Sequence, residues 1–221
     1  MSGSMKIYQE SLKHADAVFR AEGAEFAGVC GFCQEWYPTA PQRNAGCGPT
    51  VACMIMTYIL YKAFHISSPV SQGQSACLAA MEEAWRYVTP GDEGIPTTRM
   101  FCEGFLEYAK AKELDVDARS LDVPQEMAFR PSFTEILRFL SEALASDAPV
   151  AFLNLCNGDV HNLDRWHWVT ILSIEYDERE AYVRIMDEGR LMDVDLRLWY
   201  DTTVRGGGFA CFLLPEKGAV V

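Results

Sequence analysis

Residues 47–64 read CGPTVACMIMTYILYKAF. The run is mostly apolar, has the length of a buried helix and follows an irregular stretch that ends in Gly46. Pro49 falls in the first turn, where its missing N–H costs nothing. We therefore expect a core helix with Cys47 at or beside its N-terminus, among unpaired N–H groups and the positive end of the helix dipole. Such positions lower the pKa of a thiol, and the thiolate is the nucleophilic form.

Two residues of matching chemistry follow far downstream. His167 lies in RWHWVTI (165–171), a run typical of a strand, and Asp187 ends the short apolar run VRIMD (183–187). The polar segment 177–180 between them reads as a tight turn. His167 and Asp187 are almost equidistant from the centre of that turn, so antiparallel pairing would bring them close together. Cysteine, histidine and aspartate in this order form the constellation of a cysteine hydrolase.

In such a site the histidine takes the thiol proton as a general base, or holds it as an imidazolium beside a thiolate. The aspartate orients the imidazole through its other ring nitrogen. Each residue also has a structural interpretation: Cys47 as a buried cysteine, His167 as a packed histidine and Asp187 as a turn residue. Asp193 and Asp195 are alternatives to Asp187. His161, His14 and His65 are expected to be solvated.

The phrases CGPT (47–50), HWV (167–169) and Asp187 resemble the papain-like superfamily of cysteine peptidases, with the closest local match to its bacteriocin-leader-processing peptidase-like branch. The resemblance spans residues 42–187, although its specific part is only about 20 residues long. The CGSCW-type signature of papain itself is absent. The resemblance implies a papain-like α+β fold, with the nucleophile on the first core helix and the histidine and aspartate on an antiparallel sheet.

The resemblance also implies an oxyanion hole. The backbone N–H of Cys47 is one donor by position, and an upstream glutamine amide is the usual second. Gln42 is the candidate, five residues before Cys47, whereas the family's glutamine is more often six before. Asn44 and Gln34 are the alternatives.

The expected function is cleavage of a peptide, isopeptide or other amide bond through a thioester, with a peptide or protein substrate and no cofactor. Two alternatives stay open. Transfer of the acyl group to an amine uses the same three residues, and a non-catalytic binding protein on the same fold would keep them without chemistry.

Composition limits the class of protein. The chain has 221 residues, 49% of them hydrophobic, and a net charge of −12, which argues against nucleic acid and anionic membranes as partners. The apolar run 47–64 is interrupted by polar residues and is expected to be too short to span a bilayer. Residues 1–5 read as a cloning remnant and 6–221 as one domain. Eight cysteines without a secretory leader predict a cytoplasmic protein with free thiols.

The spacing of apolar residues is typical of helices over 6–148 and of strands over 149–214. This change predicts an α+β organisation. We expect a surface helix over 6–20, a long loop over 23–46, and helices over 74–88, 97–112 and from about 132. Thr97 is the expected cap of one helix, and Ser132 with Glu135 the capping box of another. The expected strands are 116–121, 150–155, 166–176, 181–186, 191–198 and 208–214.

The pair Cys30 and Cys33 forms one CxxC motif in the expected loop. One such pair is half of a zinc site, but no second CxxC or HxxxH follows. A redox motif of the thioredoxin kind would need a strand before it and a helix after it. We expect these cysteines to pack within the loop that leads to Cys47.

Overall fold

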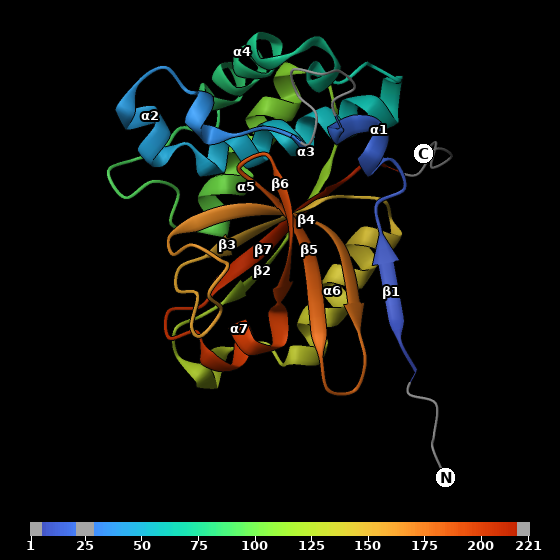
Figure 1. The fold of residues 1–221 in the computed structure, drawn as a ribbon, viewed down its shortest axis with the longest axis vertical. Coiled ribbons are helices and arrows are strands. Elements are labelled where there is room, and N and C mark those ends of the chain that lie inside the picture. Colours follow the sequence, from blue (N-terminus) through green and yellow to red (C-terminus); the bar gives the residue numbers. More distant parts are fainter. Residues whose placement is uncertain (1–5, 21–28, 216–221) are drawn as a thin grey trace.

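The structure, a computed structural model, describes residues 6–20 and 29–215. It is an α+β protein in which these residues form seven α-helices and a seven-stranded antiparallel sheet (Figure 1). The helices are α1 Ala15–Phe19, α2 Ala40–Ala45, α3 Cys47–Phe64, α4 Gln74–Trp85, α5 Thr98–Ala111, α6 Phe133–Ala145 and α7 Leu196–Thr202. The strands are β1 Tyr8–Ser11, β2 Asp117–Val123, β3 Val150–Asn154, β4 His167–Tyr176, β5 Ala181–Asp187, β6 Arg190–Asp195 and β7 Gly207–Leu213.

The sheet has the order β2-β7-β3-β4-β5-β6, and β1 pairs with the distal half of the long strand β4. Successive side chains of a strand point to opposite faces, and nearly every residue of the central strands β3, β4 and β7 is buried, so the centre of the sheet is covered on both sides. On one face, Phe101 of α5 stacks on Trp168 of β4 with ring centroids 4.4 Å apart. On the other face, Phe152 packs against Phe209 and against Trp199 of α7. The core therefore has two layers, one on each side of the sheet.

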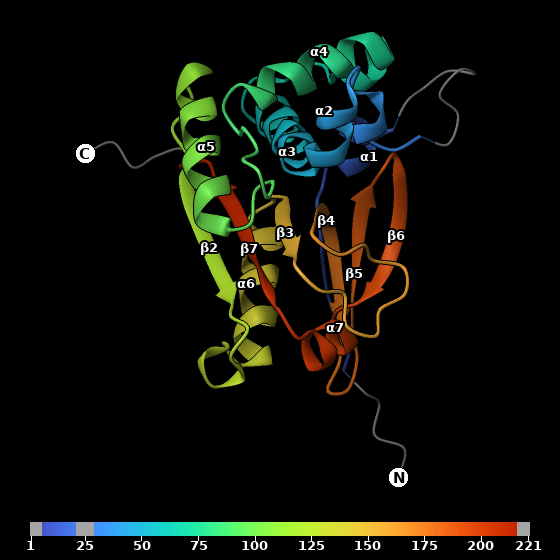
Figure 2. The ribbon, with the colours of Figure 1, turned by 90° about the vertical axis from the view of Figure 1, so that its left-hand side faces the viewer.

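The helix α3 lies at the centre of the helices drawn at the top of Figure 1. Its buried residues run without interruption from Gly48 to Ile59, and it packs against α4 and β4 (Figure 2). It is, among the described residues, the one helix that by length and composition could cross a membrane, so the expectation that it is too short was wrong on this criterion. However, 67% of it is buried within the fold, which is the position of a core helix.

Several sequence predictions are confirmed. The helix predicted over 47–64 has those limits, and α4, α5, α6 and most strands lie within a few residues of their predicted ranges. The Thr97 hydroxyl accepts a hydrogen bond from the N–H of Met100 at the start of α5. Ser132 and Glu135 form the predicted capping box of α6. Local cap chemistry therefore fixes both helix starts.

Three predictions needed correction. Residues 6–20 are not one helix: β1 joins the sheet, where Tyr8 stacks on Tyr176 of β4, and only the short α1 follows. Within 23–46, residues 34–36 form a 3-10 turn and α2 begins at a Thr39 cap, while 21–28 lie outside the described residues. The strand predicted over 191–198 ends at Asp195, whose carboxylate caps α7 by accepting from the N–H of Leu198. The predicted remnant 1–5 also lies outside the described residues.

Candidate active site

Cys47 is the first residue of α3 and is half-buried. Gly46 precedes it as the N-cap, and no side chain caps this end of the helix. The first backbone N–H groups of α3 are thus free of helical partners, and they favour negative charge nearby. Gly48 permits close packing here, because a Cβ on it would come within 2.6 Å of the Ile95 side chain. The sequence therefore places a thiol at a helix N-terminus that is packed tightly against the loop before α5.

His167 and Asp187 meet as the sequence predicted. The His167 Nε2 lies 2.7 Å from Asp187 Oδ1, and both side chains are largely buried, with 8% and 12% of their surface exposed. The pairing is not directly opposite. A register shift between Ile171 and Ser173 displaces the β4–β5 ladder, whose last pair at this end is Thr170 with Met186. Asp187 thus lies one step beyond that pair, and the bond to His167 runs diagonally across the two strands.

A two-residue turn holds Asp187 in place. Asp187 pairs with Arg190 across the β5–β6 hairpin, and the connecting residues Glu188 and Gly189 both have positive φ, 45° and 74°. Positive φ at both central residues is typical of a type I′ turn, whose twist matches that of the flanking strands in a tight hairpin. The interpretation of Asp187 as a turn residue is therefore correct as well, because it ends β5 and opens the turn.

The electrostatics of His167 depend on both neighbours. Burial lowers its pKa, but hydrogen bonds to Asp187 and to Cys47, together with their charges, outweigh burial and raise the pKa to about 10. Since Nε2 faces Asp187, the ring nitrogen left for the Cys47 thiol is Nδ1. The structure thus brings Cys47, His167 and Asp187 together, with the imidazole between a sulfur and a carboxylate.

The three candidate amides for an oxyanion hole lie in different places. Gln42 belongs to α2, where its Oε1 accepts from the Thr39 hydroxyl at 2.8 Å, so it serves the cap of its own helix. Asn44 is exposed, and it lines a separate space beside Cys47 that Gln34 does not border. Gln34 lines a narrow gap with Cys47 and Asp187, and its Nε2 donates to the carbonyl of Arg43 at 2.8 Å. Gln34 is therefore the glutamine positioned beside the sulfur.

The other candidates are engaged elsewhere or solvated. Asp193 forms two hydrogen bonds with Arg184 at 2.8 and 2.9 Å, and Asp195 caps α7. His161 is exposed. His14 is exposed, as expected, although its ring packs near Tyr61 and lies 3.9 Å from the buried Asp147.

The CxxC segment lies against the site hairpin. The N–H of Cys30 donates to the carbonyl of Gly189 at 2.8 Å, and burial raises the pKa of both Cys30 and Cys33. Both thiols are free and half-buried. Within residues 6–20 and 29–215, no group of three histidine, cysteine or acidic side chains is arranged to hold a metal ion. The segment therefore packs beside the site, as predicted.

A cavity of about 400 Å³ opens next to the thiol, and no sequence pattern predicts it. Its walls include Cys47, Ile95, Leu153, Trp166 and Trp168. These residues come from four segments of the chain, and their patterns read as ordinary core and turn chemistry. The TPGDEGIP segment (89–96) is rich in turn-forming residues, but no local signal shows which site it faces.

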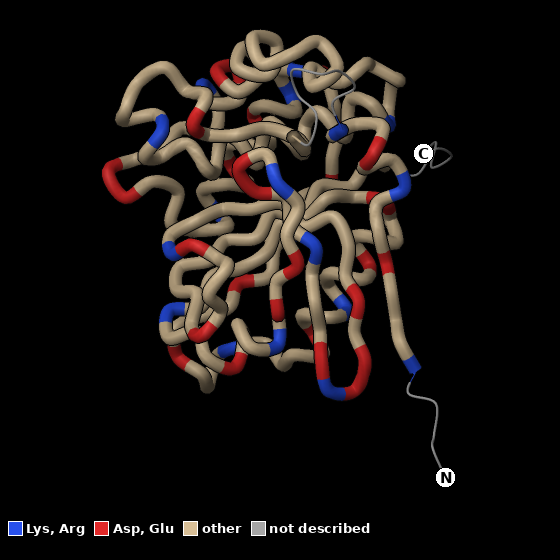
Figure 3. Tube along the Cα trace, viewed as in Figure 1, with Lys and Arg blue, Asp and Glu red and all other residues tan. Residues whose placement is uncertain are grey.

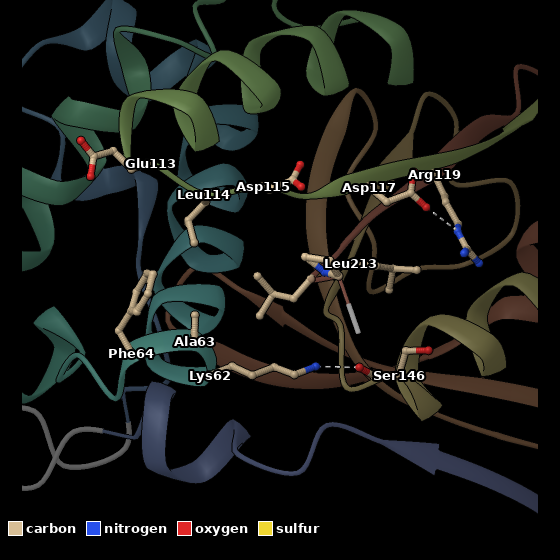
Figure 4. A pocket seen from close by; sticks show the side chains of 12 residues that line it. Lys62, Ala63, Phe64, Glu113, Leu114, Asp115, Asp117, Arg119, Ser146 and Leu213 are labelled. Carbon is tan, nitrogen blue, oxygen red and sulfur yellow. Dashed lines mark hydrogen bonds and ion pairs between the residues drawn. The ribbon is translucent and has the colours of Figure 1, made fainter. Parts of the chain in front are cut away.

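A larger cavity, of about 870 Å³, lies near the other end of α3 (Figure 4). It is lined by Lys62, Phe64, Glu113, Asp115 and Leu213, among others, and by no cysteine or histidine. Lys62 is 15 residues from Cys47 along the helix, a separation of about 22 Å. This cavity is therefore remote from the triad.

No protein-family model matches the chain, and a search of curated proteins finds no significant match.

Proposed function

We propose that this protein is a cysteine-dependent hydrolase that cleaves a peptide, isopeptide or other amide bond. The observation that carries the proposal is the position of His167, whose Nε2 lies 2.7 Å from Asp187 Oδ1 and whose ring is close enough to Cys47 for the thiol to raise the pKa of the imidazole. A buried packed histidine needs only one of these partners. A thiol and a carboxylate on opposite sides of one imidazole form the arrangement of nucleophile, base and orienting group.

The chemistry follows from the three side chains. The Cys47 thiolate would attack the acyl carbon, forming a C–S bond while the amide C–N bond breaks. His167, as an imidazolium, would give its proton to the departing amine. Water would then attack the thioester, with neutral His167 taking its proton, and the thiol would leave. Asp187 would keep the imidazole oriented through both steps.

The charge on the acyl oxygen needs donors as well. The backbone N–H of Cys47 is available at the start of α3, and the amide of Gln34 lies beside the same sulfur. We assign Gln34 as the second donor, in preference to Gln42. A papain-like fold is part of the proposal, supported by the order of the three residues, the nucleophile on a core helix and the antiparallel sheet that carries the other two.

The test is the pH dependence of iodoacetamide labelling at Cys47, located by peptide mass spectrometry. Wild type is compared with His167→Ala and with the less disruptive His167→Gln. Rapid labelling well below pH 8 in wild type, lost in both variants, is the expected result. A labelling rate that rises only near pH 8.5 and is unchanged by both substitutions would overturn the proposal.

Cys156 supplies an internal reference in the same samples. It is half-buried, and although burial raises its pKa, hydrogen bonds from the backbone at 204, 158 and 205 and the charge of Arg165 lower it overall. None of these groups involves His167. The labelling of Cys156 should therefore be the same in all three proteins, which shows that the variants are folded and the reagent is active.

A further inference from the structure

The cavity beside Cys47 has an apolar inner wall. Trp168 is 2% exposed and Leu153 3%, and both come from paired strands at the centre of the sheet. Ile95 closes the same side and packs against the first turn of α3. A side chain that enters this cavity next to the thiol therefore meets hydrocarbon and indole surface first.

The rim of the cavity is acidic. Asp92 and Glu93 form the tip of the turn between Gly91 and Gly94, and both are exposed. Neither forms an ion pair with any residue in the described part of the chain, and no lysine or arginine is among the residues that line the cavity. Figure 3 shows the acidic bend of this loop between α4 and α5 projecting from the molecule. Two negative charges thus stand uncompensated at the mouth of an apolar cavity.

The turn is held in a fixed position relative to Cys47. Gly91 and Gly94 exchange two backbone hydrogen bonds, of 2.9 and 3.0 Å. The indole Nε1 of Trp168 donates to the carbonyl of Ile95 at 2.8 Å, which ties the loop to the strand that carries His167. The acidic tip is therefore part of the same framework as the triad, and its charges are oriented before a ligand arrives.

An aromatic group at the outer edge also suits a cation. Trp166 is 47% exposed, and the guanidinium of Arg205 lies 5.4 Å from its ring centroid. One cation already stacks on this indole, as cations commonly do on tryptophan. On the far side of Cys47, Glu188 adds a further carboxylate next to Asp187. The charged residues that line the two spaces beside Cys47 are thus all acidic: Asp92, Glu93, Asp187 and Glu188.

We propose that this cavity binds a substrate side chain with an apolar stem and a cationic head, that is, arginine or lysine, next to the acyl group that Cys47 attacks. The inference rests on the proposed function and adds its substrate class. The stem would lie on Trp168, Leu153 and Ile95, and the head would reach Asp92 and Glu93. Long basic side chains combine an aliphatic stem with a charged end in this way.

The test uses three iodoacetamides that share one alkyl chain and differ only at its end. The cationic reagent carries a 4-guanidinobutyl group on the amide nitrogen, the neutral one a pentyl group and the anionic one a pentanoate. Each alkylates Cys47 with loss of iodide, and the second-order rate is read at Cys47 by peptide mass spectrometry. We expect the cationic reagent to react about tenfold faster than the neutral one, and the anionic reagent more slowly.

The double variant D92N/E93Q should bring the cationic and neutral rates to within about twofold of each other. The matched control is E113Q/D115N, which removes one glutamate and one aspartate charge from the remote cavity in Figure 4. This variant should keep the tenfold preference. Raising the salt concentration should also weaken the preference, since exposed charges are screened.

The outcomes separate the two proposals. Fast, His167-dependent labelling of Cys47 by all three reagents at equal rates overturns the cationic subsite and leaves the nucleophile intact. A cationic preference that survives in D92N/E93Q also overturns it. Slow labelling by the neutral reagent that is unchanged in His167→Gln overturns the hydrolase, and the inference with it.

Discussion

The bond between His167 Nε2 and Asp187 Oδ1 joins residues that are two positions out of register on neighbouring strands. This diagonal contact fixes the imidazole from the sheet side and leaves its other nitrogen facing the start of α3. The first prediction follows from this geometry. Asp187→Asn keeps the shape but removes the charge that stabilises the imidazolium. Labelling of Cys47 should shift to higher pH, and turnover of p-nitrophenyl acetate should fall by a factor on the order of 10²–10⁴.

The control for this prediction is Asp193→Asn. Asp193 lies on the neighbouring strand and pairs with Arg184 at the surface. Its substitution should leave both readouts unchanged. An Asp187→Asn protein with wild-type turnover would show that this carboxylate only supports the hairpin.

The second prediction separates the two glutamines. Gln34→Ala should reduce the turnover of p-nitrophenyl acetate by about 100-fold, because an oxyanion donor acts on the tetrahedral intermediate. Alkylation by iodoacetamide forms no oxyanion, so its rate should change little. Gln42→Ala is the matched variant: it removes a side chain that contacts Thr39, not Cys47, and turnover should stay within about twofold. Equal losses in the two variants would contradict the assignment of Gln34.

The third prediction concerns stability and pH. The pKa of His167 is about 10 in the folded protein, against about 6.5 for an unfolded histidine. Between these values the folded state holds more protons than the unfolded state. The stabilisation is therefore fully present below pH 6.5 or so and is lost as the pH rises towards 10, with a slope of at most about 1.4 kcal/mol per pH unit.

Urea unfolding of wild type and His167→Gln at several pH values from neutral to mildly alkaline measures this slope. The difference between the two proteins isolates His167 from the lysines, tyrosines and other cysteines that titrate at higher pH. A difference that does not vary with pH would mean that His167 takes up no net proton on folding, either because it is neutral or because Cys47 loses the proton that His167 holds; the pH dependence of Cys47 labelling tells these two states apart.

The fourth prediction concerns the attachment of the N-terminal segment. Asp147 is 5% exposed, accepts a hydrogen bond from the N–H of Lys13 at 2.8 Å and another from the Tyr58 hydroxyl, and lies 3.8 Å from Lys62 Nζ. Asp147→Ala would leave these groups without their buried acceptor and should cost about 3–5 kcal/mol. Tyr58→Phe removes one bond and should cost about 1–3 kcal/mol.

Glu103→Gln provides the surface comparison: its ion pair with Arg99 is exposed and screened by solvent, so its loss should change the free energy of unfolding far less than the loss of Asp147. The measurement is the free energy of unfolding in urea. If Asp147→Ala were no more costly than Glu103→Gln, the buried contacts around Asp147 would not hold the segment in solution.

The parts of this molecule that could be predicted are those whose structure is determined by residues close together in the sequence. The apolar run from Cys47, the Thr97 cap and the Ser132–Glu135 box each depend on neighbours within a few residues, and the contact of His167 with Asp187 follows from one short turn. The register shift in β4 has no such signal: the turn alone would place Asp187 opposite Thr170, three residues from His167, and the shift reduces this offset to two.

The errors have a common cause. Residues 6–20 have a helical composition, but the exposed edge beside β4 offers backbone partners to Tyr8–Ser11, and tertiary pairing prevails over propensity. Gln42 is nearer to Cys47 in sequence than Gln34 is, yet α2 intervenes and turns it towards its own cap. The apolar wall and acidic rim of the cavity come from segments that only the fold brings together.

The burial of α3 on all sides has a consequence for how such a molecule can change. The nucleophile sits on an element with no room to shift, and its base and orienting carboxylate sit on two paired strands. The proposed subsite, in contrast, is formed in part by the bend at 91–94 and by Trp166, both outside helices and strands. Substitutions there can alter which acyl donors are accepted without disturbing the reacting groups, so new specificities are open to evolution while the chemistry stays the same.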